Sequence, residues 1–153
     1  MGLDMYLKAN KYISGYDHSG TREVLQSVIK AAGINPAILT VDAPSISINA
    51  TVMYWRKANA IHGWFVDNCQ DGEDNCQESD VSRDSLEELQ KLCEEAVTKK
   101  DSGDLTPTEG FFFGSTEVDE YYWEELQRTA EGLKRLLADE SLKDCDFSYR
   151  ASW

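Results

Sequence analysis

Residues 54–66 read Tyr-Trp-Arg-Lys-Ala-Asn-Ala-Ile-His-Gly-Trp-Phe-Val and combine two cations, an amide, an imidazole and four aromatic rings. The guanidinium of Arg56 presents a planar fork of donors that suits phosphate or carboxylate. Lys57 adds a second positive charge, and the carboxamide of Asn59 can both donate and accept. The imidazole of His62 can accept, donate or carry a proton. This combination predicts a binding site for an anionic ligand.

Trp55 and Trp64 extend that prediction, because an indole ring can stack on a nucleobase or on a guanidinium. A helix over residues 55–66 would place the donors opposite its apolar face. The small residues Ala60 and Gly63 lie among these donors and would let a ligand or a second helix come close. The alternative is a helix packed on two sides, with its cations paired to carboxylates, which would satisfy the same donors.

A second candidate is Gly110–Gly114, a glycine-flanked aromatic segment that we expect to be a short buried strand or the end of a strand. It delivers Ser115 and Thr116 to the start of a helix expected over residues 117–138. The free N–H groups of a helix N-terminus can bind an anion. Acidic residues in the first turn, beginning with Glu117, oppose this, so capping of the helix by Ser115 or Thr116 is the favoured interpretation.

Five residues match the spacing of an EF-hand calcium loop: Asp67, Cys69, Asp71, Gly72 and Glu78. Cys69 is a poor ligand for a hard cation, and Asp74 stands where that motif requires an apolar residue. Cys69 and Cys76 have no second pair with the spacing of a zinc site. We therefore expect no bound metal.

The sequence contains none of the motifs GxSxG, GxGxxG and HExxH, and no P-loop. It has two histidines, and His18 lies in an expected turn, so His62 is the candidate base, with Ser115 or a cysteine as its nucleophile. We expect a protein without catalysis and without a cofactor, and we keep a hydrolase as an alternative.

Charge is unevenly distributed along the 153 residues, whose net charge is −13. Residues 1–66 have a net charge of +2, and residues 67–153 have a net charge of −15. This excess of acid argues against direct nucleic-acid binding and against binding to an anionic membrane surface. Neither a secretory signal nor a run of about 20 apolar residues is present, so we expect a cytoplasmic protein with reduced cysteines.

Hydrophobic periodicity and turn residues predict the order β-α-β-α-α-β-α-β. The strands are expected over residues 3–13, 45–52, 110–114 and 146–153, and the helices over residues 21–32, 55–66, 82–99 and 117–138. Ser82 or Ser85 is expected to cap the third helix, the latter in a capping box with Glu88. The expected fold is a single α+β domain over residues 1–153, with about four helices packed on a small mixed or antiparallel sheet.

Three motifs resemble a family of small phage- and prophage-encoded proteins. They are Met-Gly-Leu-Asp-Met-Tyr-Leu at residues 1–7, the segment at residues 54–66, and Gly-Phe-Phe-Phe-Gly-Ser-Thr-Glu-x-Asp-Glu at residues 110–120. The resemblance spans essentially the whole chain and brings no established activity. It implies a phage accessory protein acting in the host bacterial cytoplasm. Accessory phage proteins of this size often counter host defence, so the resemblance implies such a role by analogy alone.

Three functional hypotheses follow from these features. The first is a non-enzymatic inhibitor of host antiviral defence that binds an anionic, nucleotide-type small molecule. Arg56 and Lys57 would contact its phosphate, Asn59 and His62 its polar edge, and Trp55 or Trp64 its base. Because one helix face makes a shallow site, a homo-oligomer is plausible.

The second hypothesis is an interaction protein whose acidic half mimics nucleic acid and blocks a host defence protein. Residues 67–95 carry eleven carboxylates and two cations. The third hypothesis is a nucleotide-processing hydrolase that uses His62 together with carboxylates.

Overall fold

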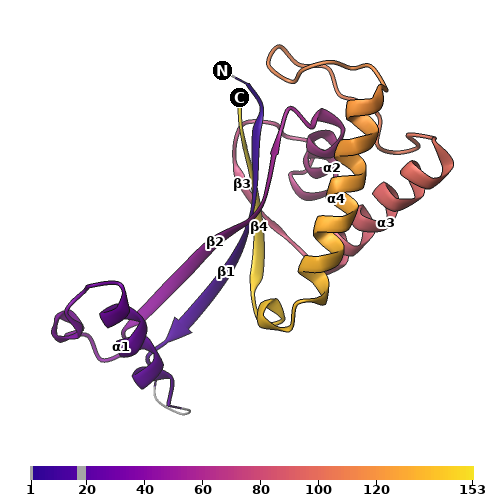
Figure 1. Cartoon of the computed structure of the whole chain (residues 1–153). Helices are drawn as coiled ribbons and strands as arrows, with labels where there is room; N and C mark the ends of the chain where they lie inside the picture. Colours follow the sequence, from indigo (N-terminus) through magenta and orange to yellow (C-terminus); the bar gives the residue numbers. More distant parts are fainter. Residues whose placement is uncertain (1, 17–19) are drawn as a thin grey trace. The chain divides into compact units, whose positions relative to one another are not determined.

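The computed structural model describes residues 2–16 and 20–153 (Figure 1). Their contacts form two compact units. We call residues 2–9 and 50–153 the larger unit and residues 10–49 the smaller unit. A single domain over residues 1–153 stays a prediction, because contacts within each unit do not determine how the two are arranged. His18, expected in a turn, lies outside the described residues.

The elements in chain order are β1 (Asp4–Ser14), α1 (Thr21–Ala31), η1 (Pro36–Ile38), β2 (Ser45–Arg56), α2 (Asn59–Cys69), β3 (Glu78–Val81), α3 (Arg83–Lys99), α4 (Glu120–Ala138), η2 (Glu140–Leu142) and β4 (Asp146–Ser152). The four strands form one antiparallel sheet in the order β2-β1-β4-β3. This confirms the predicted α+β class, with four helices and an antiparallel sheet. No helix within residues 2–16 and 20–153 combines the length and the apolar character needed to span a bilayer.

The core of the larger unit lies between its part of the sheet and the helices α2, α3 and α4, which Figure 1 shows on one side of the strands. In β1, the side chains of Met5 and Leu7 are buried, whereas those of Tyr6 and Lys8 are partly exposed. This alternation gives the strand one apolar face, which the helices cover.

The helix α3 follows the sequence prediction closely. Its buried positions are Leu86, Leu89, Cys93 and Ala96, which recur at helical spacing. Of the two predicted caps, Ser82 is the one that acts, because its hydroxyl accepts a hydrogen bond from the Ser85 N–H at 3.0 Å. The predicted capping box of Ser85 and Glu88 is wrong, since Ser85 already lies inside the helix.

The helix predicted over residues 55–66 begins four residues too early. Trp55 and Arg56 belong to β2, where Trp55 is buried while its neighbours Tyr54 and Arg56 are exposed. The strand alternation therefore continues past the predicted strand end. The chain then turns at Lys57, which has a left-handed φ of 59°, before α2 begins.

Two further predictions, both in the segment that precedes α4, are wrong. Residues 110–114 form a turn and no strand, with the Phe113 N–H donating to the Gly110 carbonyl at 3.1 Å. The following helix, α4, starts at Glu120 and is capped by Asp119, whose carboxylate accepts from the Tyr122 N–H at 3.0 Å. Asp119 also places negative charge at the positive end of the helix dipole, which favours this cap.

The strand β3 was not predicted, because it lies at the end of an acidic segment that lacks an apolar pattern. It pairs antiparallel with β4, so that Val81 faces Phe147 and Glu78 faces Arg150. Pairing with a strand about seventy positions away creates this element, and no local signal reports it.

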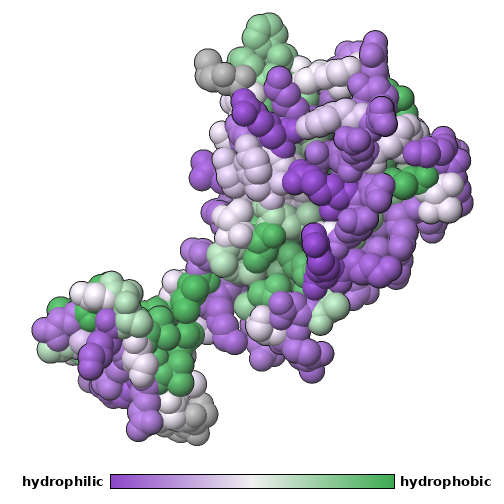
Figure 2. Space-filling model, in the orientation of Figure 1, coloured by the Kyte–Doolittle hydropathy of each residue, from purple (hydrophilic) through white to green (hydrophobic). Residues whose placement is uncertain are grey.

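The smaller unit has a small core. The large apolar side chains that are buried within its described residues are Leu25 and Ile29 of α1. Its exposed large hydrophobic side chains are Tyr12, Tyr16, Val24, Ile34, Ile38, Val41 and Ile48, and Figure 2 shows green surface there. Gly15 is needed for the close approach of its N–H to the Pro44 carbonyl, since a Cβ would lie 2.5 Å from that oxygen. The smaller unit therefore exposes more large apolar side chains than it buries.

We expect Leu25→Ala to lower the free energy of unfolding of the smaller unit by about 2–5 kcal/mol, since it leaves a cavity in a core of few residues. Val24→Ala is the matched control, because Val24 is 52% exposed, and its effect should stay below about 0.5 kcal/mol. Hydrogen exchange of the α1 amides measures both effects. Equal protection factors in the two variants would contradict the assignment of Leu25 to this core.

Candidate functional site

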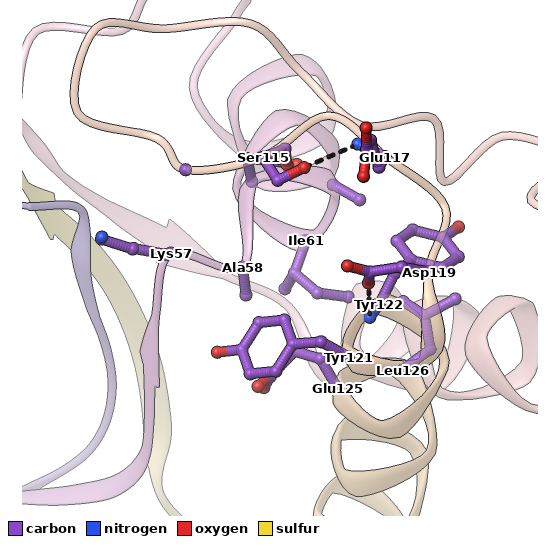
Figure 3. Close-up of a pocket in the computed structure, with 13 residues that line it drawn as sticks. Lys57, Ala58, Ile61, Ser115, Glu117, Asp119, Tyr121, Tyr122, Glu125 and Leu126 are labelled. Carbon is purple, nitrogen blue, oxygen red and sulfur yellow. Dashed lines mark hydrogen bonds between the residues drawn. The ribbon is translucent and has the colours of Figure 1, made fainter.

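Two pockets of the larger unit border α2. The first, which we call the α2 pocket, has a volume of about 170 Å³ and lies at the start of the helix (Figure 3). It is lined by Lys57, Ala58, Asn59, Ala60, Ile61, Gly114, Ser115, Glu117, Asp119, Tyr121, Tyr122, Glu125 and Leu126. The second, which we call the aromatic pocket, has a volume of about 400 Å³ and is lined mainly by residues 108–113, together with His62, Gly63, Val66, Asp67, Asp74 and Trp153.

The start of α2 supplies hydrogen-bond donors to the α2 pocket. Ala58 is the N-cap residue and has no side chain that can accept from the first N–H groups of the helix. The first backbone bond of the helix runs from the His62 N–H to the Ala58 carbonyl at 2.9 Å. The N–H groups of residues 59–61 therefore lack helical partners, and the helix dipole adds partial positive charge there.

Lys57 connects β2 to this helix in a conformation that residues with a Cβ rarely adopt. Its φ is 59°, and its N–H donates to the Leu3 carbonyl at 2.8 Å. Gly114 lies against the Lys57 side chain, and a Cβ at Gly114 would lie 3.2 Å from the Lys57 Cβ. Such backbone strain costs on the order of 1–3 kcal/mol and often occurs at functional sites.

The opposite wall of the α2 pocket carries acceptors. Figure 3 shows the carboxylate of Asp119 directed toward Ile61, and Tyr121 and Glu125 lie at the same opening. Glu125 also pairs with Arg128 at 2.5 Å, and its side chain is 11% exposed. Burial raises the pKa of Tyr121, so its phenol stays protonated at neutral pH. The pocket thus offers donors on one wall and carboxylates on the other, which suits a polar ring better than an isolated anion.

Asn59 shapes the α2 pocket by holding the segment before α4. Its side-chain amide donates to the Phe113 carbonyl at 3.2 Å and to the Ser115 carbonyl at 2.8 Å. Because both amide hydrogens are used, the carboxamide nitrogen has no donor left for a ligand. Asn59 therefore acts as a positioning residue in this structure.

His62 is buried in a chain of hydrogen bonds beside the aromatic pocket. Its Nε2 lies 3.0 Å from the carboxylate of Asp74, and its Nδ1 lies 2.8 Å from the hydroxyl of Tyr149. A carboxylate can only accept, so Nε2 carries the proton, and in the neutral ring the Tyr149 hydroxyl donates to Nδ1. Burial raises the pKa of Tyr149 well above its ordinary value. Both ring nitrogens are therefore occupied inside the protein.

The tryptophans predicted to stack on a base lie in the core. Trp55 is fully buried, and its indole N–H donates to the Thr129 hydroxyl at 2.8 Å. Trp64 is 5% exposed and packs edge-on against Phe65. Neither ring presents a free face to a ligand in this structure.

The remaining predicted site residues lie near the α2 pocket or outside it. Arg56 is exposed and does not line the α2 pocket, although its carbonyl accepts from the hydroxyl of the pocket residue Tyr121 at 3.2 Å. Ser115 lines the pocket, with its hydroxyl accepting from the Glu117 N–H at 3.0 Å. Thr116 is exposed and lines neither pocket. Ser115 and Thr116 do not cap α4, so that prediction is wrong.

Tyr121, Asp74 and Tyr149, which complete the surroundings of these pockets, could not be assigned to them from the sequence. Tyr121 belongs to the first turn of α4, and its position was hidden by the error in the start of that helix. Asp74 lies 12 positions from His62 and Tyr149 lies 87 positions from it. These separations have no periodic signal, so only the folded chain reveals the grouping.

Metal binding and thiol chemistry find little support in the described part of the chain. Residues 2–16 and 20–153 contain no group of three or more His, Cys, Asp or Glu side chains that could hold a metal ion. Burial raises the pKa of Cys69 to about 11 and that of Cys93 to about 12. Neither thiol is a ready nucleophile at neutral pH.

Comparisons with protein-family models, with curated proteins and with solved structures give no match to this chain. Ligand binding is therefore argued from the geometry of the two pockets.

We expect Tyr149→Phe to lower the free energy of unfolding by about 1–3 kcal/mol, because it leaves the buried Nδ1 of His62 without its donor. Tyr12→Phe is the control, since Tyr12 is 65% exposed. Urea unfolding measures both. The unfolded-state pKa of tyrosine is about 10, and the folded-state pKa of Tyr149 is higher, so the wild type should lose stability as the pH rises above that value. Tyr149→Phe should lose less, and identical pH profiles would contradict the assignment.

We expect iodoacetamide at about pH 8 to alkylate Cys69 and Cys93 much more slowly in the folded protein than in urea, because burial suppresses their thiolates. Mass spectrometry of tryptic peptides quantifies each site. Rapid native labelling of Cys93 would show that the interior between α3 and α4 is open to reagent.

Proposed function

We propose that this protein is a phage accessory protein that binds a nucleotide-type small molecule without converting it and so inhibits a host antiviral defence. The phage origin and the role against defence come from the sequence resemblance. The α2 pocket is the structural observation that supports binding of a nucleotide. Its contacts differ from those expected from the sequence, since the base-stacking tryptophans are buried.

A nucleobase fits the chemistry of the α2 pocket. Its ring nitrogens and carbonyl groups can accept from the free N–H groups at the start of α2. Its amino groups can donate to the carboxylates of Asp119 and Glu125. Ile61, Leu126 and the Tyr121 ring supply the apolar contacts. At about 170 Å³ the pocket is smaller than the usual site for a drug-sized ligand, which favours one flat ring over a larger group.

In this proposal the phosphate of the ligand binds outside the carboxylate wall, where Lys57 and Arg56 can reach it. Figure 3 shows the ammonium of Lys57 directed away from Asp119 and Glu125. Arg56 is exposed on the neighbouring position of β2, with 63% of its side chain accessible. Asp4 lies 4.0 Å from the Arg56 Nε, so this pair is loose and the guanidinium is free to turn toward phosphate.

The absence of catalysis is proposed because His62, the candidate base, does not line the α2 pocket. His62 is 0% exposed and is bound on both ring nitrogens. A general base must reach the proton that it removes, directly or through one water. A hydrolase centred on His62 would need this chain of hydrogen bonds to open first.

Self-association is a further part of the proposal. The smaller unit carries equal numbers of basic and acidic residues, three of each between positions 10 and 49, in a chain whose net charge is −13. Association through its exposed apolar side chains would avoid the repulsion between acidic surfaces.

Calorimetry against a panel of cyclic and linear nucleotides tests the proposal, with binding expected at micromolar concentrations and with the nucleotide recovered unchanged. Arg56→Gln combined with Lys57→Gln should weaken binding about tenfold, because two phosphate contacts are lost. Lys91→Gln combined with Lys143→Gln removes the same charge from exposed positions outside the pocket and should leave affinity unchanged.

Ala58→Asp provides a second variant, in which an aspartate at the N-cap occupies the free N–H groups of α2. It should abolish nucleotide binding. Because Ala58 is 6% exposed, the unfolding midpoint is measured alongside, and binding is compared only if the variant is folded. No binding by the wild type to any nucleotide, or turnover of a bound one, would overturn the proposal.

A further inference from the structure

The aromatic pocket has a chemistry opposite to that expected of a nucleotide site. Its walls carry the rings of Phe111–Phe113 and Trp153 and the carboxylates of Asp67, Asp74 and Glu109. Its described lining contains neither lysine nor arginine. An anion would meet three carboxylates there, so the pocket repels phosphate and favours an organic cation.

Asp74 is held in a defined orientation inside the aromatic pocket. One carboxylate oxygen accepts from the Trp153 indole N–H at 3.0 Å, and the other accepts from His62 at 3.0 Å. Each carboxylate oxygen has a second acceptor site. The Asp74 side chain is 26% exposed, so these remaining sites can meet a cation that enters the pocket.

The aromatic side chains can pack against both the aliphatic stem and the flat charged group of a long organic cation. Phe113 packs edge-on against His62 with ring centroids 5.0 Å apart, and lies 6.1 Å from Trp153. Phe111 is 94% exposed beside this wall. The Phe111 ring is therefore accessible to a side chain that enters the pocket.

We propose that the aromatic pocket receives an arginine side chain from the surface of a basic partner protein. Arginine combines a stem that packs on phenyl rings with a planar guanidinium that stacks on aromatic faces and binds carboxylates in pairs. Lysine is a compact, strongly hydrated cation and fits aromatic walls less well. The acidic surface of residues 67–153 would attract the basic partner, and the pocket would anchor it.

This inference is independent of nucleotide binding at the α2 pocket, and each can fail without the other. The probe is the tripeptide acetyl-Gly-Arg-Gly-amide, titrated into the full chain while the indole N–H resonance of Trp153 is followed by NMR. That resonance is assigned by its loss in Trp153→Phe. We expect a saturable shift of the Trp153 resonance with the arginine peptide. The same peptide with lysine in place of arginine should bind about tenfold more weakly, and the peptide with glutamine should not bind.

Charge-matched variants separate the pocket from general attraction to an acidic protein. Asp67→Asn combined with Glu109→Gln removes two carboxylates of the pocket and should weaken arginine binding about tenfold. Glu88→Gln combined with Glu124→Gln removes two exposed carboxylates elsewhere and should change it less than about twofold.

Phe111→Ala tests the aromatic wall at a position that contributes little to folding, because the ring is 94% exposed. It should also weaken binding of the arginine peptide, with an unchanged unfolding midpoint. Equal affinities in the pocket variant and its charge-matched control, or an unmoved Trp153 signal at millimolar peptide, would overturn the proposal. Equal affinity for the arginine and lysine peptides would overturn the choice of arginine.

Discussion

The imidazole of His62 joins three parts of the larger unit through two hydrogen bonds, and the two pockets depend on where it holds α2. Its Nδ1 binds Tyr149 of β4, and its Nε2 binds Asp74 in the segment before β3. One turn further along α2, the ring of Phe65 stacks on Tyr149 with centroids 3.9 Å apart. These contacts fix the height and rotation of α2 over the sheet, because moving the helix would break hydrogen bonds of a buried polar group, which costs free energy.

The same helix then serves as a wall for two sites of different character. At its start, the missing side-chain cap leaves N–H donors facing the carboxylates of α4 across the α2 pocket. Along its flank, Gly63 lets Thr108 approach the helix backbone, so that residues 108–113 close the aromatic pocket. A side chain at Gly63 would push this segment away, which explains why a small residue is required there.

Charge is organised by position in the fold as well as by position in the sequence. Lys57 lines the α2 pocket, and Arg56 is exposed next to it in the sequence. Carboxylates line the opposite wall of that pocket, and three acidic residues lie among the aromatic rings of the aromatic pocket. Figure 2 shows largely hydrophilic surface over α3 and α4, where exposed glutamates follow one another along the helices. A single protein can thus attract a basic partner over a wide surface and still bind one phosphate at a local cationic edge.

The sequence by itself determined the elements whose signals are local. The apolar repeat of α3, its serine cap, and the alternation in β1 and β4 each follow from neighbouring residues, so the α+β class could be predicted. The order of the strands, the short β3 and the partners of His62 were decided only by the tertiary structure. Asp74, Tyr149 and Trp153 meet His62 through contacts that span 12 to 87 positions, for which no periodicity exists. Trp55 and Asn59 were predicted to contact a ligand, but in the folded chain both form hydrogen bonds within the protein. The same donors can bind a ligand or a neighbouring residue, and packing decides which.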